Sequence, residues 1–307
     1  MVERSTWADR DPSRQRVIVF GDVIDDVVVV PSGGIRVDTD TKSSIHSYPG
    51  GSAANTAAWL GFLGTAVDFV GIVGRDDLAR HTRLLEETGV TAHLTAHESL
   101  PTGTIVVIVD GNERTMLTER GANPELTPDA VTADLLASAS LLHLTGYSLF
   151  GRLDPAPIVS LIARAGAAGV TVTVDPGSSG FLRDHGVERF LAQVTGATIV
   201  FPNLDEAQTL TGRTEPHEAA LALTQHFAVV AVTCDRAGVI VASNGVVGPL
   251  IPAGPVQLID PTGAGDGFSA GFLHQWLVAP DAATAARAGM RVAALAITQL
   301  GARPRVG

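Results

Sequence analysis

Residues 139–146 read ASLLHLTG, an apolar segment of strand type that a helical stretch and a second apolar segment follow. Three more segments of this kind come later in the chain: GVTVTVDP at 169–176, ATIVFPN at 197–203 and FAVVAVTC at 227–234. Short apolar runs that alternate with helices are typical of a parallel sheet covered by helices on both faces. The sequence therefore predicts a three-layer α/β fold with a central, mostly parallel sheet.

Two strand-rich stretches interrupt this alternation, residues 27–49 and residues 100–120. In an open α/β sheet, ligands bind outside the carboxyl ends of the strands. We therefore expect the two stretches to form a small β-sheet that covers this edge as a lid; two ordinary surface hairpins are the alternative. We expect the lid to belong to a domain of residues 16–307 and a disordered tail of residues 1–15 to precede it.

Composition excludes several classes of function. The 307 residues carry a net charge of −11, and Lys42 is the only lysine. This charge argues against a nucleic-acid-binding protein, which needs clustered lysine and arginine. Cys234 is the only cysteine, so neither an intramolecular disulfide nor a cysteine-rich zinc site is expected. The polar N-terminus lacks a signal peptide's apolar core, and no apolar run approaches the ~18 residues of a membrane span. We therefore expect a cytoplasmic protein.

Residues 260–273 read DPTGAGDGFSAGFL and place one acid, Asp266, among glycines at the start of a predicted helix. The dinucleotide fingerprint GxGxxG fails because Phe268 occupies its third glycine position, and a P-loop is impossible because the sequence has no Gly-Lys pair. Glycine permits close backbone approach, and the free N–H groups of a first helical turn bind anions.

We interpret this segment as a phosphate-binding turn. The backbone of Gly263, Ala264 and Gly265 would form an anion hole for the transferred phosphoryl group. Asp266 would accept the proton of the attacking hydroxyl as a general base. The alternative is that Asp266 only caps the helix.

Two further segments accompany this turn: GGSAANTAA at 50–58 and PNLDEAQTLTG at 202–212. Together with the glycine turn, these segments closely resemble, in their order along the chain, the signatures of the ribokinase-like, or PfkB, family of carbohydrate kinases. The resemblance extends over roughly residues 17–303. The resemblance implies a ribokinase-like fold and an ATP- and Mg²⁺-dependent phosphotransferase. The expected acceptor is a primary alcohol of a small sugar, and Asp266 matches the family's catalytic base.

The resemblance assigns further residues to the sugar. Asp26 matches the aspartate that binds sugar hydroxyls, with Asp25 as a less favoured candidate. The sugar-side signature matches Gly50, Gly51 and Asn55.

On the nucleotide side, the resemblance implies that Asn203 and Glu206 organise Mg²⁺ and the phosphates, largely through water. Thr233 and Gly238 match a stretch beside the nucleotide, although Asp235 replaces one of its glycines.

A potassium site is also implied. Asp260 and Thr262 match residues that hold K⁺ together with a loop whose end resembles GARP at 301–304. Arg305 stands where ribokinases commonly have a small hydroxyl residue, which weakens this match.

The substrate is left open by the sequence. Ser52 replaces the lysine of many ribokinases, and GGSAANTA also occurs in nucleoside-phosphorylating relatives, so a nucleoside kinase of the same fold is an alternative. Only 5% of residues are aromatic, although an aromatic wall would help to bind a base. Arg114 and Arg120 are candidate cations for binding an anionic group, with solvated surface charges as the alternative. Tyr147 or Ser148 is a candidate hydroxyl donor.

A non-catalytic relative that binds sugar or nucleotide is a second alternative, which the intact Asp266 argues against. Lid strands in such kinases often pair between subunits, so the apolar run at 27–30 also suggests a homodimer.

Overall fold

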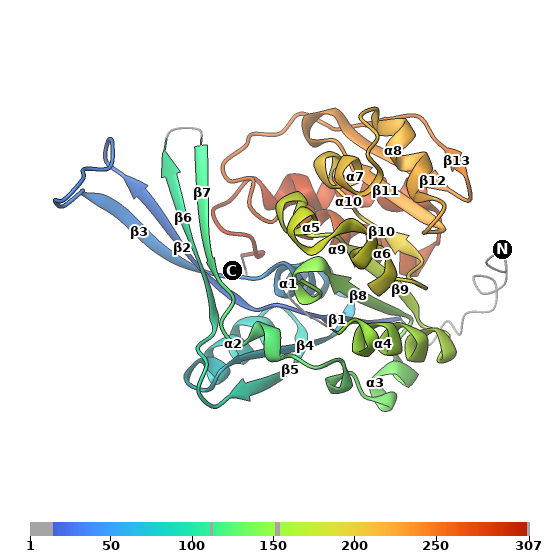
Figure 1. Ribbon diagram of the computed structural model, residues 1–307, viewed down its shortest axis with the longest axis horizontal. Helices are drawn as coiled ribbons and strands as arrows, with labels where there is room; N and C mark the ends of the chain where they lie inside the picture. Colours follow the sequence, from blue (N-terminus) through green and yellow to red (C-terminus); the bar gives the residue numbers. More distant parts are fainter. Residues whose placement is uncertain (1–14, 111–112, 151–153, 306–307) are drawn as a thin grey trace.

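The main sheet of the computed structural model, which describes residues 15–110, 113–150 and 154–305, runs in the order β13-β12-β11-β10-β9-β8-β1-β4-β5 (Figure 1). All neighbours from β11 to β5 pair in parallel, as predicted. The antiparallel pairing of β12 with β11 and with the short β14 was not predicted. The strands are β1 Arg16–Phe20, β4 Ala66–Gly74, β5 Val90–His97, β8 Leu141–Thr145, β9 Thr171–Asp175, β10 Ile199–Val200, β11 Val229–Thr233, β12 Gly238–Ser243, β13 Val246–Val247 and β14 Ile251–Pro252.

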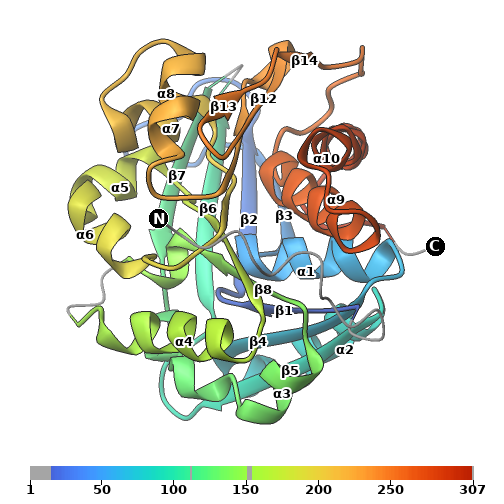
Figure 2. The same cartoon turned by 90° about the vertical axis from the view of Figure 1, so that its right-hand side faces the viewer.

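Helices cover both faces of this sheet because its strands are apolar on both sides. In β1, Val17 and Val19 belong to one hydrophobic core, whereas Ile18 and Phe20 belong to the other. The first core includes residues of α1 Ser52–Phe62, α2 Leu78–Glu86, α9 Ala264–Val278 and α10 Ala282–Ala296. The second includes residues of α3 Ala133–Ser138, α4 Ala156–Ala167, α5 Ser179–His185, α6 Val187–Gln193, α7 Leu204–Thr211 and α8 Pro216–Leu223 (Figure 2). The predicted three-layer α/β fold is confirmed.

The described residues also include five short 3-10 helices. They are η1 Arg75–Asp77, η2 Asn123–Glu125, η3 Pro128–Ala130, η4 Gly146–Ser148 and η5 Asp235–Ala237. The predicted tail of residues 1–15 lies, apart from Gln15, outside the described residues.

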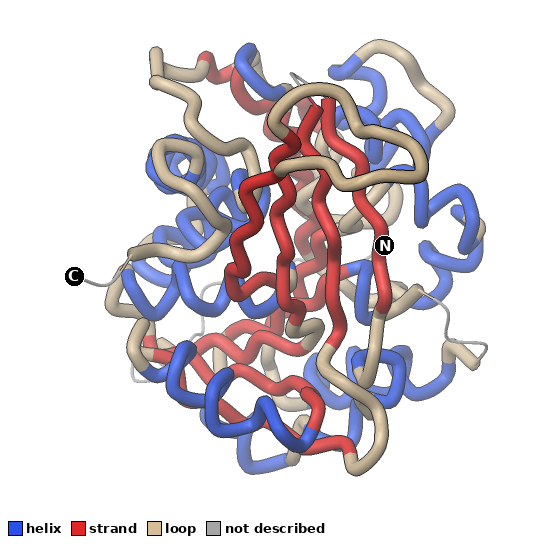
Figure 3. The backbone as a smooth tube through the Cα atoms, turned by 90° about the vertical axis from the view of Figure 1, so that its left-hand side faces the viewer, coloured by secondary structure: helices blue, strands red, loops and turns tan. Residues whose placement is uncertain are grey.

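A second sheet of four strands stands beside the main one, in the order β3-β2-β6-β7. Its strands are β2 Ile24–Pro31, β3 Ser43–Gly50, β6 Gly103–Asp110 and β7 Glu113–Glu119. β2 pairs in parallel with β6, and the two outer pairs are antiparallel. The apolar run at 17–30 is therefore two strands, β1 and β2, that belong to different sheets. In Figure 3, no helix lies over the face of the small sheet that points away from the main sheet.

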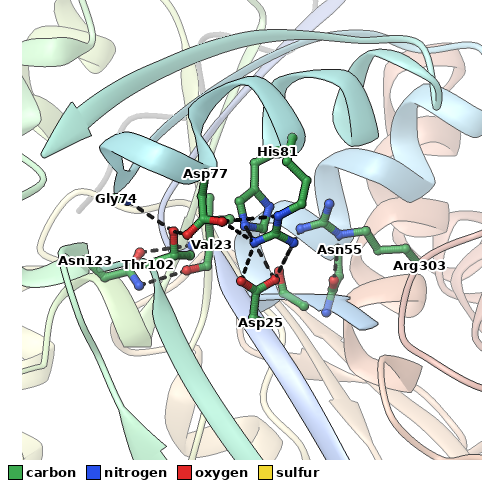
Figure 4. A network of polar contacts seen from close by, with 11 residues as sticks. Val23, Asp25, Asn55, Gly74, Asp77, His81, Thr102, Asn123 and Arg303 are labelled. Carbon is green, nitrogen blue, oxygen red and sulfur yellow. Dashed lines mark hydrogen bonds and ion pairs between the residues drawn. The ribbon is translucent and has the colours of Figure 1, made fainter. Parts of the chain in front are cut away.

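Hydrogen bonds attach the base of the small sheet to the rest of the protein (Figure 4). Just before β2, the backbone N–H of Val23 donates to Asn123 Oδ1 at 3.0 Å, and Asn123 Nδ2 donates to the Val23 carbonyl at 2.9 Å. Just before β6, the Thr102 hydroxyl donates to Asp77 at 2.7 Å and accepts from the Gly74 N–H at 3.1 Å. The start of β2 is thus held in a fixed position, and with it the acids that follow.

Candidate active site

A cavity of about 300 Å³ lies at the carboxyl ends of the parallel strands, between one face of the small sheet and the first turn of α9. Most of the residues that the sequence singled out line it. These are Asp26, Gly51, Asn55, Asn203, Glu206, Thr233, Thr262, Gly263, Ala264, Gly265 and Asp266. Gly50, Gly238 and Asp260 do not line it.

The glycine turn shapes the cavity end of α9. Gly263 is the N-cap residue and adopts a left-handed conformation with φ 80°. A Cβ atom at this position would lie 2.8 Å from atoms of Ala302, so only glycine fits. The Gly267 N–H donates to the Gly263 carbonyl at 2.8 Å, which begins the helical hydrogen bonding. The N–H groups before it belong to the unbonded first turn, although that of Ala264 donates to the Pro261 carbonyl at 3.3 Å.

Asp266 is held by two side chains of α1. The Ser52 hydroxyl donates to Oδ1 at 2.7 Å, and Asn55 Nδ2 donates to Oδ2 at 2.9 Å. Burial raises the pKa of Asp266 to about 7, against the effect of these hydrogen bonds. A carboxylate with a pKa near neutrality is well matched to a general base. The capping alternative is wrong, because Gly263 occupies the N-cap position and no side chain caps α9.

Ser52 and Asn55 point the same way because residues three apart share one face of a helix. Their helix begins after Gly51, whose φ of 93° requires glycine. The buried Asp22, which the sequence analysis did not single out, accepts from the N–H groups of Ser52 at 2.8 Å and Ala53 at 3.2 Å. Asp22 therefore occupies the positive end of α1 and keeps Ser52 and Asn55 directed at Asp266.

Asp25 and Asp26 point to opposite faces of the small sheet, because successive residues of a strand alternate. Asp26 lines the cavity, and burial raises its pKa to about 7. Asp25 instead accepts from Arg80 Nη1 at 2.8 Å and Nη2 at 2.5 Å (Figure 4). Burial acts to raise the pKa of Asp25, but hydrogen bonds from His81 and Arg80 outweigh it and hold the pKa well below its usual range. Of the two acids, Asp26 lines the cavity and Asp25 does not.

Gly50 makes room for that acid. A Cβ atom on Gly50 would lie 2.2 Å from Asp26 Oδ2. The absence of a side chain at this position therefore serves the carboxylate that lines the cavity, rather than direct contact with a ligand.

Asn203 and Glu206 form a capping box at the start of α7. Asn203 Oδ1 accepts from the Glu206 N–H at 2.9 Å, and the Glu206 carboxylate accepts from the N–H and Nδ2 of Asn203 at 2.9 and 2.8 Å. Burial raises the pKa of Glu206. The pair lines the cavity while it also organises its own helix.

Asp175, at the end of β9, is a second carboxylate on this side of the cavity. Burial, and then repulsion from Glu206, raises its pKa. The sequence analysis missed Asp175, although its place at the carboxyl end of a predicted strand was a usable signal.

Two carboxylates that repel each other suit a divalent cation, since Mg²⁺ is commonly held by one or two carboxylates plus phosphate oxygens. Among the described residues, no group of three or more His, Cys, Asp or Glu side chains is arranged to hold a metal ion.

Gly238 and Asp260 have structural surroundings. Gly238 has φ 125°, and a Cβ atom there would lie 1.9 Å from the Ile251 carbonyl oxygen, so glycine allows β12 to pair with β14. Asp260 accepts from the N–H and hydroxyl of Thr262 at 2.9 and 2.6 Å and from the Gly301 N–H at 3.1 Å. It therefore joins the loop before α9 to the loop after α10.

One wall of the cavity is apolar. The small sheet contributes Ile24, Ile105, Val107 and Met116. η4 and the turn after it contribute Tyr147 and Phe150, and α5 contributes Phe181; the centroids of these three rings lie 5.6–6.0 Å apart. The sequence analysis missed this cluster, because Phe181 lies about 30 residues beyond Tyr147 and Phe150 in the chain and only folding brings the three rings together.

The polar groups of Tyr147 and Arg120, beside this wall, donate hydrogen bonds to backbone carbonyls. The Tyr147 hydroxyl donates to the Gly177 carbonyl at 2.9 Å. Arg120 donates to the carbonyls of Phe150 and Tyr147, at 2.6 Å in each case. Arg120 still lines the cavity, whereas the side chain of Arg114 lies outside what the structure describes.

Comparison with known proteins gives consistent results. The pattern of the pfkB family of carbohydrate kinases matches residues 14–306. An ATP-dependent ribose-1-phosphate kinase from Halopiger xanaduensis is 31% identical over 281 residues, which cover 88% of this chain and 89% of that protein. The bifunctional protein HldE from Caulobacter vibrioides is 28% identical over 308 residues, and this chain spans 60% of its length.

Among solved structures, adenosine kinase from Sinorhizobium meliloti superimposes with a TM-score of 0.85 at 26% identity, over 95% of this chain and 97% of that one. In the described residues, no helix has the length and apolar character that crossing a membrane requires.

Proposed function

Because the chain belongs to the pfkB family of carbohydrate kinases, we propose that its cavity binds a small sugar and ATP and that Asp266 accepts the proton of the phosphorylated hydroxyl. The observation that carries this proposal is the place of Asp266. It lies at the N-terminal end of α9, in one cavity with Asp26 and Asn55, and the hydrogen bonds from Ser52 and Asn55 fix both of its oxygens.

The chemistry follows from this arrangement. The O–H bond of the acceptor breaks as its oxygen bonds to the γ-phosphorus, the proton passes to Asp266, and ADP leaves with the electrons of the broken P–O bond. Phosphoryl transfer passes through a loose transition state, so orientation matters as much as basicity. The first-turn N–H groups of Gly265 and its neighbours are placed to stabilise charge on the migrating group, and losing one such donor typically costs about 2.7–4 kcal/mol.

Asp175 and Glu206 are the residues that would hold Mg²⁺, in part through water, with Asn203 fixing the Glu206 carboxylate. Bound Mg²⁺ supplies charge neutralisation on the phosphate oxygens of ATP. Thr233 lies next to Asn203 through a β-bridge and would face the nucleotide. Gly238 would contribute only through the shape of the adjoining strand.

Asp260 and Thr262 form the proposed K⁺ site, because the Asp260 carboxylate lies between the loop before α9 and the loop at Gly301. Activity in KCl should exceed activity in an equal concentration of choline chloride. Equal rates in the two salts would remove K⁺ from the proposal.

The small sheet, which includes most of residues 27–49 and 100–120, is proposed as a lid that excludes water during transfer.

The outward face of the small sheet is apolar, with Val27, Val29, Val106 and the exposed Ile45 and Leu117. A second copy of the chain is the proposed partner for this face. Light scattering that shows a monomer at micromolar concentration would exclude such a homodimer. Because the proposed kinase depends on ATP, the cytoplasm is its proposed location.

A nucleoside is the second candidate acceptor, and the apolar wall favours it. A base could pack between Ile105 or Met116 of the small sheet and the Tyr147, Phe150 and Phe181 rings, since aromatic groups pack favourably at these separations. The similarity to an adenosine kinase agrees with this candidate. A sugar phosphate, suggested by the ribose-1-phosphate kinase relative, would depend on the positive charge of Arg120, which lines the cavity while it donates to two backbone carbonyls.

An ADP-release assay tests these candidates directly. Purified protein with ATP and Mg²⁺ would be given pentoses, hexoses, sugar phosphates and nucleosides in parallel. A sugar or a nucleoside should give ADP release well above the ATP-only background, and the product's phosphate position can be read by NMR. No turnover with any acceptor, despite measurable ATP binding, would contradict the proposed function and favour a non-catalytic binding protein.

A further inference from the structure

Arg303 is a buried cation next to the proposed site that the sequence analysis did not single out. It follows α10 in the segment GARP, and 7% of its surface is exposed. The backbone around it is fixed, because Trp59 Nε1 donates to the Ala302 carbonyl at 2.8 Å and Gln299 Nε2 donates to the Arg303 carbonyl at 2.7 Å. A buried charge is costly unless its interactions compensate for lost hydration, so its contacts indicate why it is there.

The guanidinium links two elements of the sugar side. Arg303 Nε donates to Asn55 Oδ1 at 3.2 Å, and Nη2 donates to the Gly50 carbonyl at 2.7 Å (Figure 4). Asn55 in turn donates from Nδ2 to Asp266 at 2.9 Å. Arg303 therefore reaches Asp266 through one intervening side chain, across the junction of β3 and α1.

Donors and acceptors along this chain of contacts can be assigned in one way only. A guanidinium can only donate hydrogen bonds, and an ionised carboxylate can only accept them. The amide of Asn55 has one oxygen and one NH₂ group, so Arg303 selects the orientation in which the oxygen faces the guanidinium and the NH₂ group faces Asp266. In the reversed orientation, the Asn55 oxygen would face the Asp266 carboxylate, and the two acceptors would repel each other.

We propose that Arg303 is a positioning residue for phosphoryl transfer, which fixes the Asn55 amide so that Asn55 holds Asp266 ready to accept a proton. Arg303 does not touch the reacting atoms, because it lies behind Asn55 and outside the cavity lining. This inference rests on the proposed role of Asp266.

Charge supports the same role. Four carboxylates favour the charged form of Arg303: Asp26 and Asp25 on β2, Asp22 before β2, and Asp266 on α9. Burial lowers the pKa of Arg303 to about 10, so it stays positive at neutral pH. Its Nη1 is buried without a hydrogen-bond partner among the described residues, and its charge lowers the pKa of Asp26 against the larger effect of burial. Arg303 thus favours the ionised forms of both acids at the site.

The test is a double-mutant cycle with Arg303→Met, Asn55→Ala and the pair, with kcat, KM and pH dependence measured for each. Loss of Arg303 should lower kcat by about tenfold or more, as expected when hydrogen bonding to a charged group is lost, with little change in KM for ATP. The acid limb of kcat should move to higher pH. In the Asn55→Ala background, the same change should cost much less, because residues that act through one another are not additive.

Arg303→Lys is the second variant, because it keeps the charge but cannot make both donations in the same geometry. The kcat of this variant should lie between those of wild type and Arg303→Met, and the acid limb of its pH profile should match wild type. If Arg303→Met fails to fold, Arg303→Lys replaces it in the double-mutant cycle. Arg164→Met is the matched control. Arg164, like Arg303, donates two hydrogen bonds, but its acceptors are the carbonyls of Val131 and Pro128, and it lies on α4, outside the cavity lining.

Two results would overturn the proposal. One is that Arg303→Met lowers kcat equally with and without Asn55. The other is that Arg303→Met lowers kcat by the same factor at every pH and that this loss is explained by a lower melting temperature alone. Asp266→Asn separates these failures from failure of the proposed function. If that variant is inactive while Arg303→Met behaves like wild type, only the role of Arg303 is wrong. If Asp266→Asn retains full activity, the proposed proton acceptor itself is wrong.

Discussion

Asn55 and Asp266 are separated by 211 positions in the sequence, yet Asn55 Nδ2 donates to Asp266 Oδ2 at 2.9 Å. This bond joins the first turn of α1 to the first turn of α9, and so unites two of the three sequence signatures at one carboxylate. Helix N-termini attract anions. Asp22 already occupies the N-terminus of α1, and the Asn203–Glu206 capping box occupies that of α7. Of these three helices that border the cavity, α9 is therefore the one whose N-terminus is left for a phosphate.

Replacing Asp266 with Asn should abolish nearly all turnover. The change keeps the size of the side chain but removes the proton acceptor, and general-base catalysis contributes about 10²–10⁴ in rate. ATP binding, measured by calorimetry, should be unchanged because the anion-binding N–H groups remain. A variant that keeps more than about a tenth of the wild-type rate would contradict the assignment.

The pH dependence of kcat/KM should show an acid limb with a midpoint near neutrality. Burial raises the pKa of Asp266 to about 7 and that of Asp26 to about 7. Asp266 must be ionised to take the proton, and an ionised Asp26 accepts a stronger hydrogen bond from a hydroxyl than the protonated acid does. Activity should therefore be low below this pH and rise through it. Activity recovered after return to pH 8 controls for unfolding. A profile that stays flat down to about pH 5 would show that neither group limits the reaction.

Replacing Ser52 with Ala should move this acid limb to higher pH. The Ser52 hydroxyl donates to Asp266 Oδ1 and stabilises its ionised form, so its loss should raise the pKa of Asp266. Ser138→Ala is a matched control, since the Ser138 hydroxyl donates to a carbonyl within α3. The same shift in both variants would exclude a specific effect of Ser52.

Asp25 and Asp26 should respond differently to replacement with Asn. Asp26→Asn should raise KM for the acceptor with little loss of stability, because its carboxylate lines the cavity. Asp25→Asn should instead lower the melting temperature, because Asp25 pairs with Arg80. The reverse pattern in kinetics and thermal unfolding would show that the wrong acid was assigned to the substrate.

The stabilising effect of Asp25 should also depend on pH in a defined direction. Hydrogen bonds from His81 and Arg80 outweigh burial and depress the folded-state pKa of Asp25. The ionised carboxylate therefore contributes stability above its unfolded pKa of about 3.9, and the contribution falls away as the pH drops toward the folded value. The difference in melting temperature between wild type and Asp25→Asn should accordingly shrink in acid. A difference that persists unchanged to about pH 2 would contradict this linkage.

Replacing Gly263 with Ala should disrupt the turn before α9. Its φ of 80° disfavours any side chain, and the new Cβ atom would overlap with Ala302. We expect lower kcat and a lower melting temperature. Gly166→Ala is the control, because open space surrounds this glycine within α4, and stability should rise by roughly 0.5–1 kcal/mol. Wild-type behaviour of Gly263→Ala would show that the turn tolerates a side chain.

The fold class was determined by local sequence features. Apolar strands that alternate with helices specify a parallel sheet covered on both faces, because each strand must bury two faces. The glycine turn at Asp266 was likewise readable, since left-handed backbone at Gly263 depends on the absence of a side chain at that one position. Resemblance to a family then connected this turn with Asn55 and Glu206.

Only the tertiary structure decided which groups meet. In the sequence, no motif marks Asp175 or Arg303 as a site residue, and Phe150 and Phe181 are ordinary apolar residues. Folding brings Asp175, Phe150 and Phe181 to the cavity wall. It also places Arg303 behind Asn55. The structure also shows that Gly50 makes room for Asp26 and that Gly238 serves a strand pairing. Periodicity and turns arise between near neighbours, so a sequence records them directly. Contacts between distant segments depend on how the layers pack, and no local pattern encodes them.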